Sequence, residues 1–348
     1  MSAAAVAPAT MVGLGKQTPG AGGLGPIERP VPVAVPGHVV LEVTAAGLCG
    51  TDLHIEDGEF PSAPPVLMGH EVAGRVAEVG ADVTDELLGA LVAVETYFSF
   101  CGACEYCRAG RTNLCRERRS IGSHVDGGFA PWLLVPAANL HRMPAHVGPH
   151  AAALSEPLAC VCHCLADPAR ISPGDAVLVT GPGTMGLLAA QVARTCGGIV
   201  TVLGTPQDEV RLEAARSLGF EIRTTAQDAA ELERRFDVVV ECSGSDGGIG
   251  TCIAAARPGA TLVQIGLAGH PVRIPFDEIC YRELTVTSGF ASTPESWRRA
   301  MRLLEQRAVD LDLLVSQVAP LSDWQEIFRR TRAGDGIKFV FEPRWEDR

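Results

Sequence analysis

The chain contains 348 residues, 47% of them hydrophobic and only 5% aromatic, and its formal net charge at pH 7 is -12. That length allows two domains of ordinary size. The negative charge argues against a nucleic-acid partner, because phosphate binding needs clustered Lys and Arg. No apolar run approaches the ~18 residues of a membrane helix, and no secretory signal is visible. We therefore expect a cytoplasmic protein with no membrane and no nucleic-acid partner.

The first part of the chain has the pattern of an all-β domain. Residues 1–10 are small and featureless, so we expect them to be disordered. Gly and Pro are dense at 13–36, which predicts turns and edge strands. Strand patterns follow at 39–43, 71–79 and 91–95, and their spacing by Gly and Pro favours a barrel-like domain over a helical one.

The segment Gly-Leu-Cys49-Gly-Thr51-Asp-Leu-His54 and the following Gly-His70-Glu71 gather chemically active side chains. Cys, His and Glu are ligand types of a catalytic zinc, which takes three protein ligands and leaves one position open. The Thr51 hydroxyl and the His54 imidazole are neutral at physiological pH and can pass a proton. We expect this segment to be the chemical centre.

Four cysteines form a second pattern, in which Cys101, Cys104 and Cys107 are three residues apart and Cys115 follows. Four thiolates close a tetrahedral site with no open position, which predicts a structural zinc. An iron–sulfur cluster is less compatible, since the bacterial ferredoxin run has a shorter last gap and a following Pro. In a cytosolic chain of this size, the remaining cysteines are interpreted as buried thiols rather than disulfides.

Glu156 lies inside the apolar helical segment 151–165. A buried carboxylate needs a partner, because burying one alone is costly. A metal is one such partner, and a local cap or ion pair is the other interpretation.

From residue 176 the pattern changes to alternating strands and helices. The run 176–180 predicts a buried strand, and Gly181-Pro-Gly183-Thr184-Met185-Gly186 follows it and opens a helix at 187–195. That context is the one a G-x-G-x-x-G fingerprint requires to hold a pyrophosphate at a helix N-terminus. Further strand and helix patterns follow at 199–203, 209–218, 236–241, 247–256, 260–265 and 284–287. They predict an α/β, doubly wound parallel sheet of the dinucleotide-binding (Rossmann) kind.

The nucleotide subtype is read at the end of the second strand of this sheet. An NAD site usually has an acid there, which binds the ribose hydroxyls. Gly204 occupies that place and Thr205 follows, while Arg211 lies within reach of a 2′-phosphate. Both NAD and NADP stay open, with a slight preference for NADP.

The order of these motifs resembles that of the zinc-dependent medium-chain alcohol dehydrogenases, over nearly the whole chain from about Met11. Polyol (sorbitol or L-iditol type) and threonine 3-dehydrogenases are the branches most similar to it. The resemblance implies a GroES-like β-barrel catalytic domain at 1–154, completed by 296–348, and a Rossmann NAD(P) domain at 155–295. It also implies a homodimer or homotetramer.

The resemblance further implies one catalytic and one structural zinc per chain. Cys49, His70 and Glu71 would lie at the catalytic zinc, with Glu156 as an alternative ligand or water partner, and Thr51 and His54 would form the proton relay. The expected reaction moves a hydride between a secondary alcohol of polyol, sugar or cyclitol type, or its ketone, and NAD(P).

Two departures from the family pattern affect these expectations. Animal sorbitol dehydrogenases carry an Arg-Tyr pair where this chain has Ala291-Ser292 after Gly289-Phe290, which puts sorbitol itself in doubt. The missing acid at Gly204 puts strict NAD use in doubt. The competing interpretations are a threonine-type amino-alcohol dehydrogenase and, from another class, a non-catalytic nucleotide sensor, which would be expected to lose Cys49, His70 or Thr51.

Overall fold

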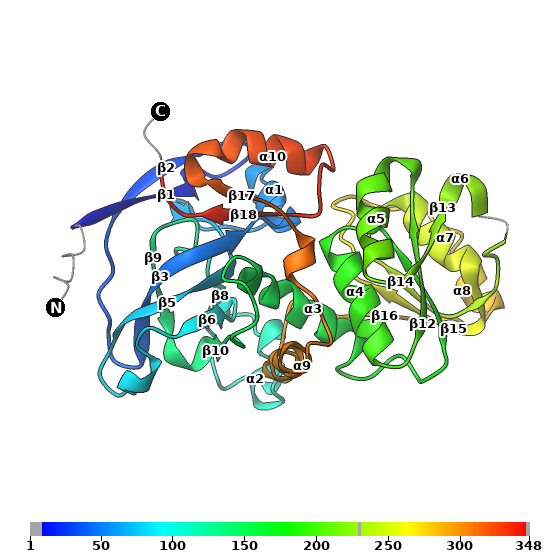
Figure 1. Cartoon of the computed structure of the whole chain (residues 1–348), viewed down its shortest axis with the longest axis horizontal. Coiled ribbons are helices and arrows are strands. Elements are labelled where there is room, and N and C mark those ends of the chain that lie inside the picture. The colour runs from blue at the N-terminus through cyan, green and yellow to red at the C-terminus, as the bar shows by residue number, and fades with distance from the viewer. Residues whose placement is uncertain (1–8, 229–230, 346–348) are drawn as a thin grey trace. The chain divides into compact units, whose positions relative to one another are not determined.

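The computed structural model describes residues 9–228 and 231–345, so most of the segment expected to be disordered lies outside the described residues. The chain divides into two units (Figure 1). The first comprises the chain up to Glu156, Gln317–Ala333 and the residues from Phe339 onward; the second comprises Pro157–Ser316 and Gly334–Lys338. Within the described ranges, no helix combines the length and apolar composition needed to cross a membrane.

The first unit is built around strand β3, His38–Gly47. From Val39 to Gly47 it pairs antiparallel with β5, while its first half pairs with β9 and its last two residues pair with β18. The largest sheet has the order β10-β6-β5-β3-β18-β17, and a second sheet has the order β2-β1-β4. The strands are β1 Thr10–Lys16, β2 Leu24–Pro30, β4 Val66–Leu67, β5 Glu71–Val79, β6 Leu91–Val94, β7 Tyr97–Ser99, β8 Arg119–Ser120, β9 Trp132–Pro136, β10 Leu140–Arg142, β17 Val315–Pro320 and β18 Lys338–Glu342.

Alternation along these strands contributes to several apolar cores in the first unit. One core contains Val39, Leu41 and Val43 of β3, which point to one face of the sheet as the period of two requires. Another core contains Phe129 and Phe341, whose rings meet edge to face with centroids 5.2 Å apart. Its helices are α1 Gly50–Glu56, α2 Glu105–Arg108 and α10 Trp324–Arg332; α3 Ser155–Leu165 begins at its boundary.

The second unit contains one six-stranded sheet in which every neighbouring pair is parallel. Its order is β13-β12-β11-β14-β15-β16, so successive strands run outward in one direction from β11 and in the other from β14. This reversal is the switch point at which open α/β sheets bind ligands. The strands are β11 Ala176–Thr180, β12 Ile199–Gly204, β13 Glu221–Thr224, β14 Phe236–Glu241, β15 Ala256–Gln264 and β16 Thr285–Ser288.

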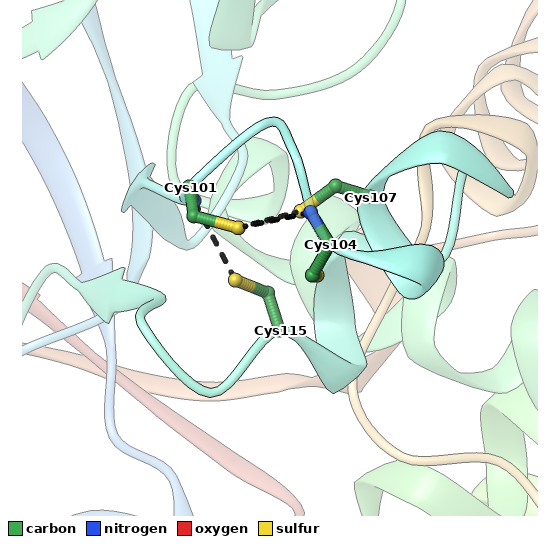
Figure 2. A group of neighbouring side chains, drawn as sticks. All are labelled: Cys101, Cys104, Cys107 and Cys115. Carbon is green, nitrogen blue, oxygen red and sulfur yellow. Dashed lines mark hydrogen bonds between the residues drawn. The ribbon is translucent and has the colours of Figure 1, made fainter.

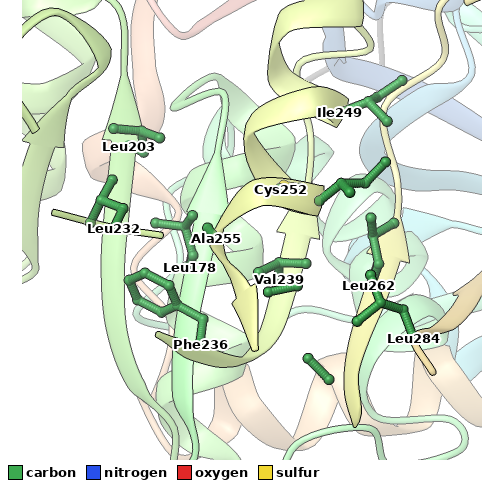
Figure 3. Close-up of a cluster of buried hydrophobic side chains, with 13 residues drawn as sticks. Leu178, Leu203, Leu232, Phe236, Val239, Ile249, Cys252, Ala255, Leu262 and Leu284 are labelled. Carbon is green, nitrogen blue, oxygen red and sulfur yellow. The ribbon is translucent and has the colours of Figure 1, made fainter. Parts of the chain in front are cut away.

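Helices cover both faces of this sheet, with α4 and α5 on one side and α7 and α8 on the other (Figure 1). Leu178, Val239 and Leu262 from three adjacent strands pack with Cys252 of α7 in one apolar cluster (Figure 3). Continuous apolar runs such as that of β14 suit a strand covered on both faces. The helices are α4 Thr184–Thr195, α5 Glu209–Ser217, α6 Thr225–Asp228, α7 Asp246–Ala255, α8 Asp277–Tyr281 and α9 Pro294–Glu305.

The observed units divide the chain differently from the expected domains, most of all over 296–316. The sequence predicts that the first domain resumes at 296, whereas α9 and the residues up to Ser316 belong to the second unit. Contacts within that unit give the reason. The Gln191 side chain of α4 exchanges two hydrogen bonds with the backbone of Asp310, and Trp297 of α9 is fully buried.

Candidate active site and structural metal centre

Cys49 stands at the turn that joins β3 to α1. It is the N-cap residue of α1, and its backbone N–H donates to Asp52 Oδ2 at 2.9 Å. A carboxylate three residues into a helix satisfies one of the donors that every helix start leaves open. The turn is thereby fixed, and Thr51 follows in the first turn with its Oγ1 3.6 Å from Cys49 Sγ.

Strand pairing brings Glu71 to the same place. Gly47 of β3 is opposite Glu71, the first residue of β5. A Cβ at Gly47 would lie 2.1 Å from Glu71 Oε2, so a glycine is needed for the carboxylate to fit. Gly69, at φ +88°, turns the chain into His70.

The ligand atoms of Cys49, His70 and Glu71 all lie within 4.8 Å of one another. Glu71 is 1% exposed, and the His70 side chain is 12% exposed. Burial lowers the pKa of His70, but the Asp52 carboxylate and the Cys49 sulfur outweigh burial and hold that pKa well above its ordinary value. A thiol, an imidazole and a carboxylate converging in this way match the donor set of a catalytic zinc.

Asp52 is the residue that sequence reasoning missed. It is fully buried, and its Oδ1 lies 3.7 Å from His70 Nδ1, beyond hydrogen-bond length. Among the described residues, this oxygen has no hydrogen-bond partner. Because Nδ1 is turned toward Asp52, Nε2 is the ring nitrogen left for a metal. A carboxylate behind a ligating histidine commonly orients the ring in this way. The signal available was a carboxylate three residues after Cys49.

Glu156 is not part of the three-residue group. Its Oε1 accepts a hydrogen bond from Thr96 Oγ1 at 2.9 Å, and the residue is 5% exposed. The described groups whose ligand atoms all lie within 4.8 Å of one another include Cys49, His70 and Glu71 but not Glu156. The assignment of Glu156 as an alternative ligand or water partner therefore stays a prediction.

His54 lies in the last turn of α1, and its Nδ1 is 2.7 Å from Glu59 Oε2. Within the described part of the chain, Thr51 and His54 make no hydrogen bond to each other. The two residues lie one helical turn apart on α1, so a proton passing from one to the other would need an intermediate carrier between them.

Two cations hold the C-terminal end of α1. The buried Lys16 ammonium donates to the carbonyl oxygens of Gly20 (2.5 Å), Gly22 and Glu56 (3.0 Å). Burial lowers the pKa of Lys16, and three acceptors use all three ammonium protons. Arg332 of α10 binds both oxygens of Asp57 at 2.8 Å. The helix that carries Thr51 and His54 is therefore tied to β1 and to α10.

The four cysteines expected to hold a structural metal converge in one loop (Figure 2). Their sulfur atoms all lie within 4.8 Å of one another, and none forms a disulfide. Backbone N–H groups of Ala103 and Cys104 lower the pKa of the Cys101 thiol to about 7, whereas desolvation raises that of Cys107 to about 12. A closed group of four sulfur atoms fits zinc.

The glycine fingerprint occupies the carboxyl end of β11. Gly181 has φ +77°, and a Cβ there would lie 2.6 Å from Ser243 N. At Gly186 a Cβ would lie 2.0 Å from Gly181 O, so the turn needs both glycines. Gly183 is the N-cap residue of α4 and offers no side-chain cap. The first N–H groups of α4, from Thr184 to Gly186, are therefore free to bind a pyrophosphate.

At the end of β12, Gly204 is followed by a capped turn. Asp208 Oδ2 accepts hydrogen bonds from Thr205 N (2.9 Å) and Thr205 Oγ1 (2.7 Å). Arg211 Nη1 lies 3.2 Å from Asp208 Oδ1, and its Nε donates to Gly336 O. Asp208 is thus committed to the turn and to Arg211.

Comparison with known proteins agrees with this architecture. Residues 35–145 match the alcohol dehydrogenase GroES-like domain, and residues 184–306 match the zinc-binding dehydrogenase family. The chain is 36% identical to a sorbitol dehydrogenase of Halalkalibacterium halodurans, covering 96% of this chain and 99% of the relative. It is 34% identical to an L-threonine 3-dehydrogenase of Saccharopolyspora erythraea, covering 94% and 97%.

Comparison with solved structures also finds a zinc-binding dehydrogenase. A protein of Sinorhizobium meliloti 1021 described as a zinc-binding dehydrogenase, bound to NADP, aligns with TM-score 0.87 and 33% identity over 97% of this chain and all of that one. The predicted fold class, a GroES-like domain with a Rossmann domain, is confirmed. The chain belongs to the zinc-dependent medium-chain alcohol dehydrogenases and is an NAD(P)-dependent alcohol oxidoreductase.

Proposed function

We propose that the protein oxidises a secondary alcohol of polyol, sugar or cyclitol type, or reduces the matching ketone. The observation that carries this proposal is the group of Cys49, His70 and Glu71 with the Thr51 hydroxyl 3.6 Å from Cys49 Sγ. This proximity supports a role for the Thr51 hydroxyl in accepting the alcohol proton beside a three-ligand metal group. The similarity to a sorbitol dehydrogenase supports the polyol class.

The residues of the chain divide the work of this reaction. A zinc held by Cys49, His70 and Glu71 would supply Lewis-acid activation of the alcohol oxygen, and a bound NAD(P) would supply the hydride acceptor. Thr51 accepts the alcohol proton and passes it on to His54. The His54 ring is oriented by Glu59, whose exposed carboxylate leads toward solvent. The buried Asp52 keeps the His70 ring oriented.

The cofactors of this proposal are one catalytic and one structural zinc per chain and NAD(P), with a slight preference for NADP. The absence of an acid at Gly204 and the position of Arg211 near the end of β12 favour acceptance of a 2′-phosphate. The similarity to a structure bound to NADP supports it. The negative charge of Asp208 disfavours a 2′-phosphate, since this carboxylate lies beside Arg211 in the same turn.

A homodimer or homotetramer in the cytoplasm completes the proposal. The outermost strand β16 leaves a row of unpaired backbone groups at the edge of the parallel sheet. Val286 of this strand is 50% exposed, and Tyr281 and Phe276 before it are more exposed still. The twelve free cysteines suit a reducing compartment.

A threonine-type amino alcohol is the second candidate substrate, supported by the similarity to L-threonine 3-dehydrogenases. The convergence of Cys49, His70 and Thr51 argues against the nucleotide-sensor interpretation, since a sensor has no need of these groups.

The test is a reduction assay with NAD⁺ or NADP⁺ and a panel of polyols, sugars, cyclitols, threonine and simple alcohols, with zinc measured in parallel. We expect turnover of a polyol or sugar and two zinc ions per chain. Cys49→Ser should abolish turnover, whereas Cys280→Ser, at an exposed thiol in α8, should leave it unchanged. Full activity in the Cys49 variant would refute the site, and turnover of threonine alone would move the protein to the second substrate class.

A further inference from the structure

Glu241, the last residue of β14, is a buried carboxylate that the reaction as described does not use. It is 0% exposed. Its Oε1 accepts hydrogen bonds from Ser243 N (2.7 Å), Ser243 Oγ (2.5 Å) and Thr180 Oγ1 (3.3 Å). Its Oε2 accepts from Gly244 N (3.0 Å) and Gln264 Nε2 (2.7 Å). Five donors directed at two oxygens suit the acceptor-only, ionised form of the side chain.

These donors come from the ends of three adjacent strands. Thr180 ends β11 and directly precedes the glycine fingerprint, Gln264 ends β15, and Ser243 and Gly244 follow β14 itself. A backbone hydrogen bond also joins the ends of β11 and β14, because Cys242 N donates to Thr180 O at 3.0 Å. One side chain therefore joins the loops after β11, β14 and β15 at the carboxyl edge of the sheet.

Glycines close this arrangement so tightly that no other residue fits. A Cβ at Gly266 would lie 2.8 Å from Glu241 Oε2, and one at Gly248 would lie 2.7 Å from Oε1. The Cβ of a residue at Gly181, the first fingerprint glycine, would meet Ser243 N. The fingerprint turn thus rests directly on the loop that Glu241 holds.

The charge of Glu241 has no counter-ion. Among the residues that the structure describes, no Lys, Arg or His forms an ion pair with it. The switch point lies between β11 and β14, so a dinucleotide whose pyrophosphate is at α4 extends its second nucleotide over β14 and β15. That nucleotide carries the nicotinamide, which is cationic when oxidised and neutral when reduced.

We propose that Glu241 is a positioning residue for the nicotinamide half of the cofactor site, and that its buried charge favours the oxidised over the reduced cofactor. The inference rests on the cofactor placement proposed above. The hydrogen bonds fix the loops that form the floor of that half-site. The uncompensated charge stabilises a nearby cation in a region of low dielectric.

The test is nucleotide binding to the zinc-loaded protein by titration calorimetry, with oxidised and reduced NAD and NADP. Glu241→Gln removes the charge and turns an amide group toward donors. We expect binding of both forms to weaken, the oxidised form by on the order of tenfold more than the reduced form. Glu241→Asp keeps the charge but shortens the reach, so both forms should weaken with their affinity ratio unchanged. Glu221→Gln, at an exposed carboxylate of β13, is the matched control and should change neither.

An equal loss for both forms in Glu241→Gln would overturn the charge effect, and unchanged binding of both would overturn the inference entirely. A purely structural role would not move the oxidised-to-reduced ratio. If that variant does not fold, Gln264→Ala decides, because it removes one donor and keeps the charge. Weakening of both forms by about threefold at a constant ratio supports the positioning role of Glu241, and unchanged affinity refutes that role. A parent protein that binds no nucleotide would instead overturn the proposed cofactor site and this inference with it.

Discussion

Replacing Asp52 by Asn tests how the protein holds its catalytic metal. The substitution is nearly isosteric and keeps an oxygen for the Cys49 N–H, which now donates to Asp52 Oδ2 at 2.9 Å. It removes the negative charge 3.7 Å from His70 Nδ1. The turn should therefore survive while the electrostatic support of the histidine is lost.

The size of the effect follows from this geometry. Carboxylates behind ligating histidines typically contribute 10–100-fold in metal affinity, which corresponds to about 1.4–2.8 kcal/mol. We expect the upper part of that range, because Asp52 is fully buried and buried charges are screened much less than exposed ones. The pKa of His70, which Asp52 and Cys49 raise, should fall in the metal-free variant.

Chelator competition monitored by zinc analysis measures the change. Asp52→Asn should release one zinc per chain at a chelator concentration about 10–100-fold lower than the parent requires, and the second zinc should stay bound. Asp85→Asn, at an exposed carboxylate of the same unit, is the control. Two zinc ions held as tightly as in the parent would refute the role assigned to Asp52.

The remaining predictions concern stability. Cys104→Ser should lose the structural zinc and at least about 2 kcal/mol, lowering Tm by at least about 4 °C in calorimetry; an unchanged Tm with both metals bound would contradict it. Gly181→Ala should cost about 2–4 kcal/mol in urea unfolding, since it adds a strained backbone and a Cβ 2.6 Å from Ser243 N, and a smaller loss than about 1 kcal/mol would speak against the close packing. The hydrogen bond from Arg332 lowers the pKa of Asp57, so its contribution is present above the unfolded pKa and lost as pH falls through the folded one. Asp57→Asn should cost less than about 1 kcal/mol at pH 7, because the pair is 40% exposed, and the cost should shrink as the pH is lowered below the unfolded carboxyl pKa; a cost that does not shrink on acidification would refute this origin.

Local patterns predicted the elements of both units well, because each rests on a period or a turn residue. The bounds of β5, β11 and β14 are those expected, since continuous or alternating apolar runs end there at polar or Gly residues. The membership of helix α9 in the second unit was not expected, since 296–348 was assigned to the first domain. An amphipathic helix shows the same apolar stripe whichever partner covers it, and the Gln191–Asp310 contact joins residues 119 positions apart.

The residues that sequence reasoning missed act through other residues. A carboxylate three residues after Cys49 can cap a helix or support a metal-binding histidine, and the sequence does not distinguish these roles. The fold shows that Asp52 lies in position for both. Glu241 ends an apolar strand, and the argument that led to Glu156 applied to it equally. Which donors surround such a carboxylate depends on loops that meet only after the sheet has formed.

The residues proposed to hold zinc and those proposed to hold the nucleotide lie in separate units of the chain, so each proposal can be tested by its own binding measurement. The proposed zinc ligands Cys49, His70 and Glu71 belong to the first unit, whereas the glycine fingerprint and Glu241 belong to the second. Because zinc retention and nucleotide binding are each measured directly, a variant in one unit can be scored on both without relying on turnover. Turnover alone cannot separate the two, because it needs both. Binding measurements on each unit's own ligand can, and they assign any loss of activity to the residues that cause it.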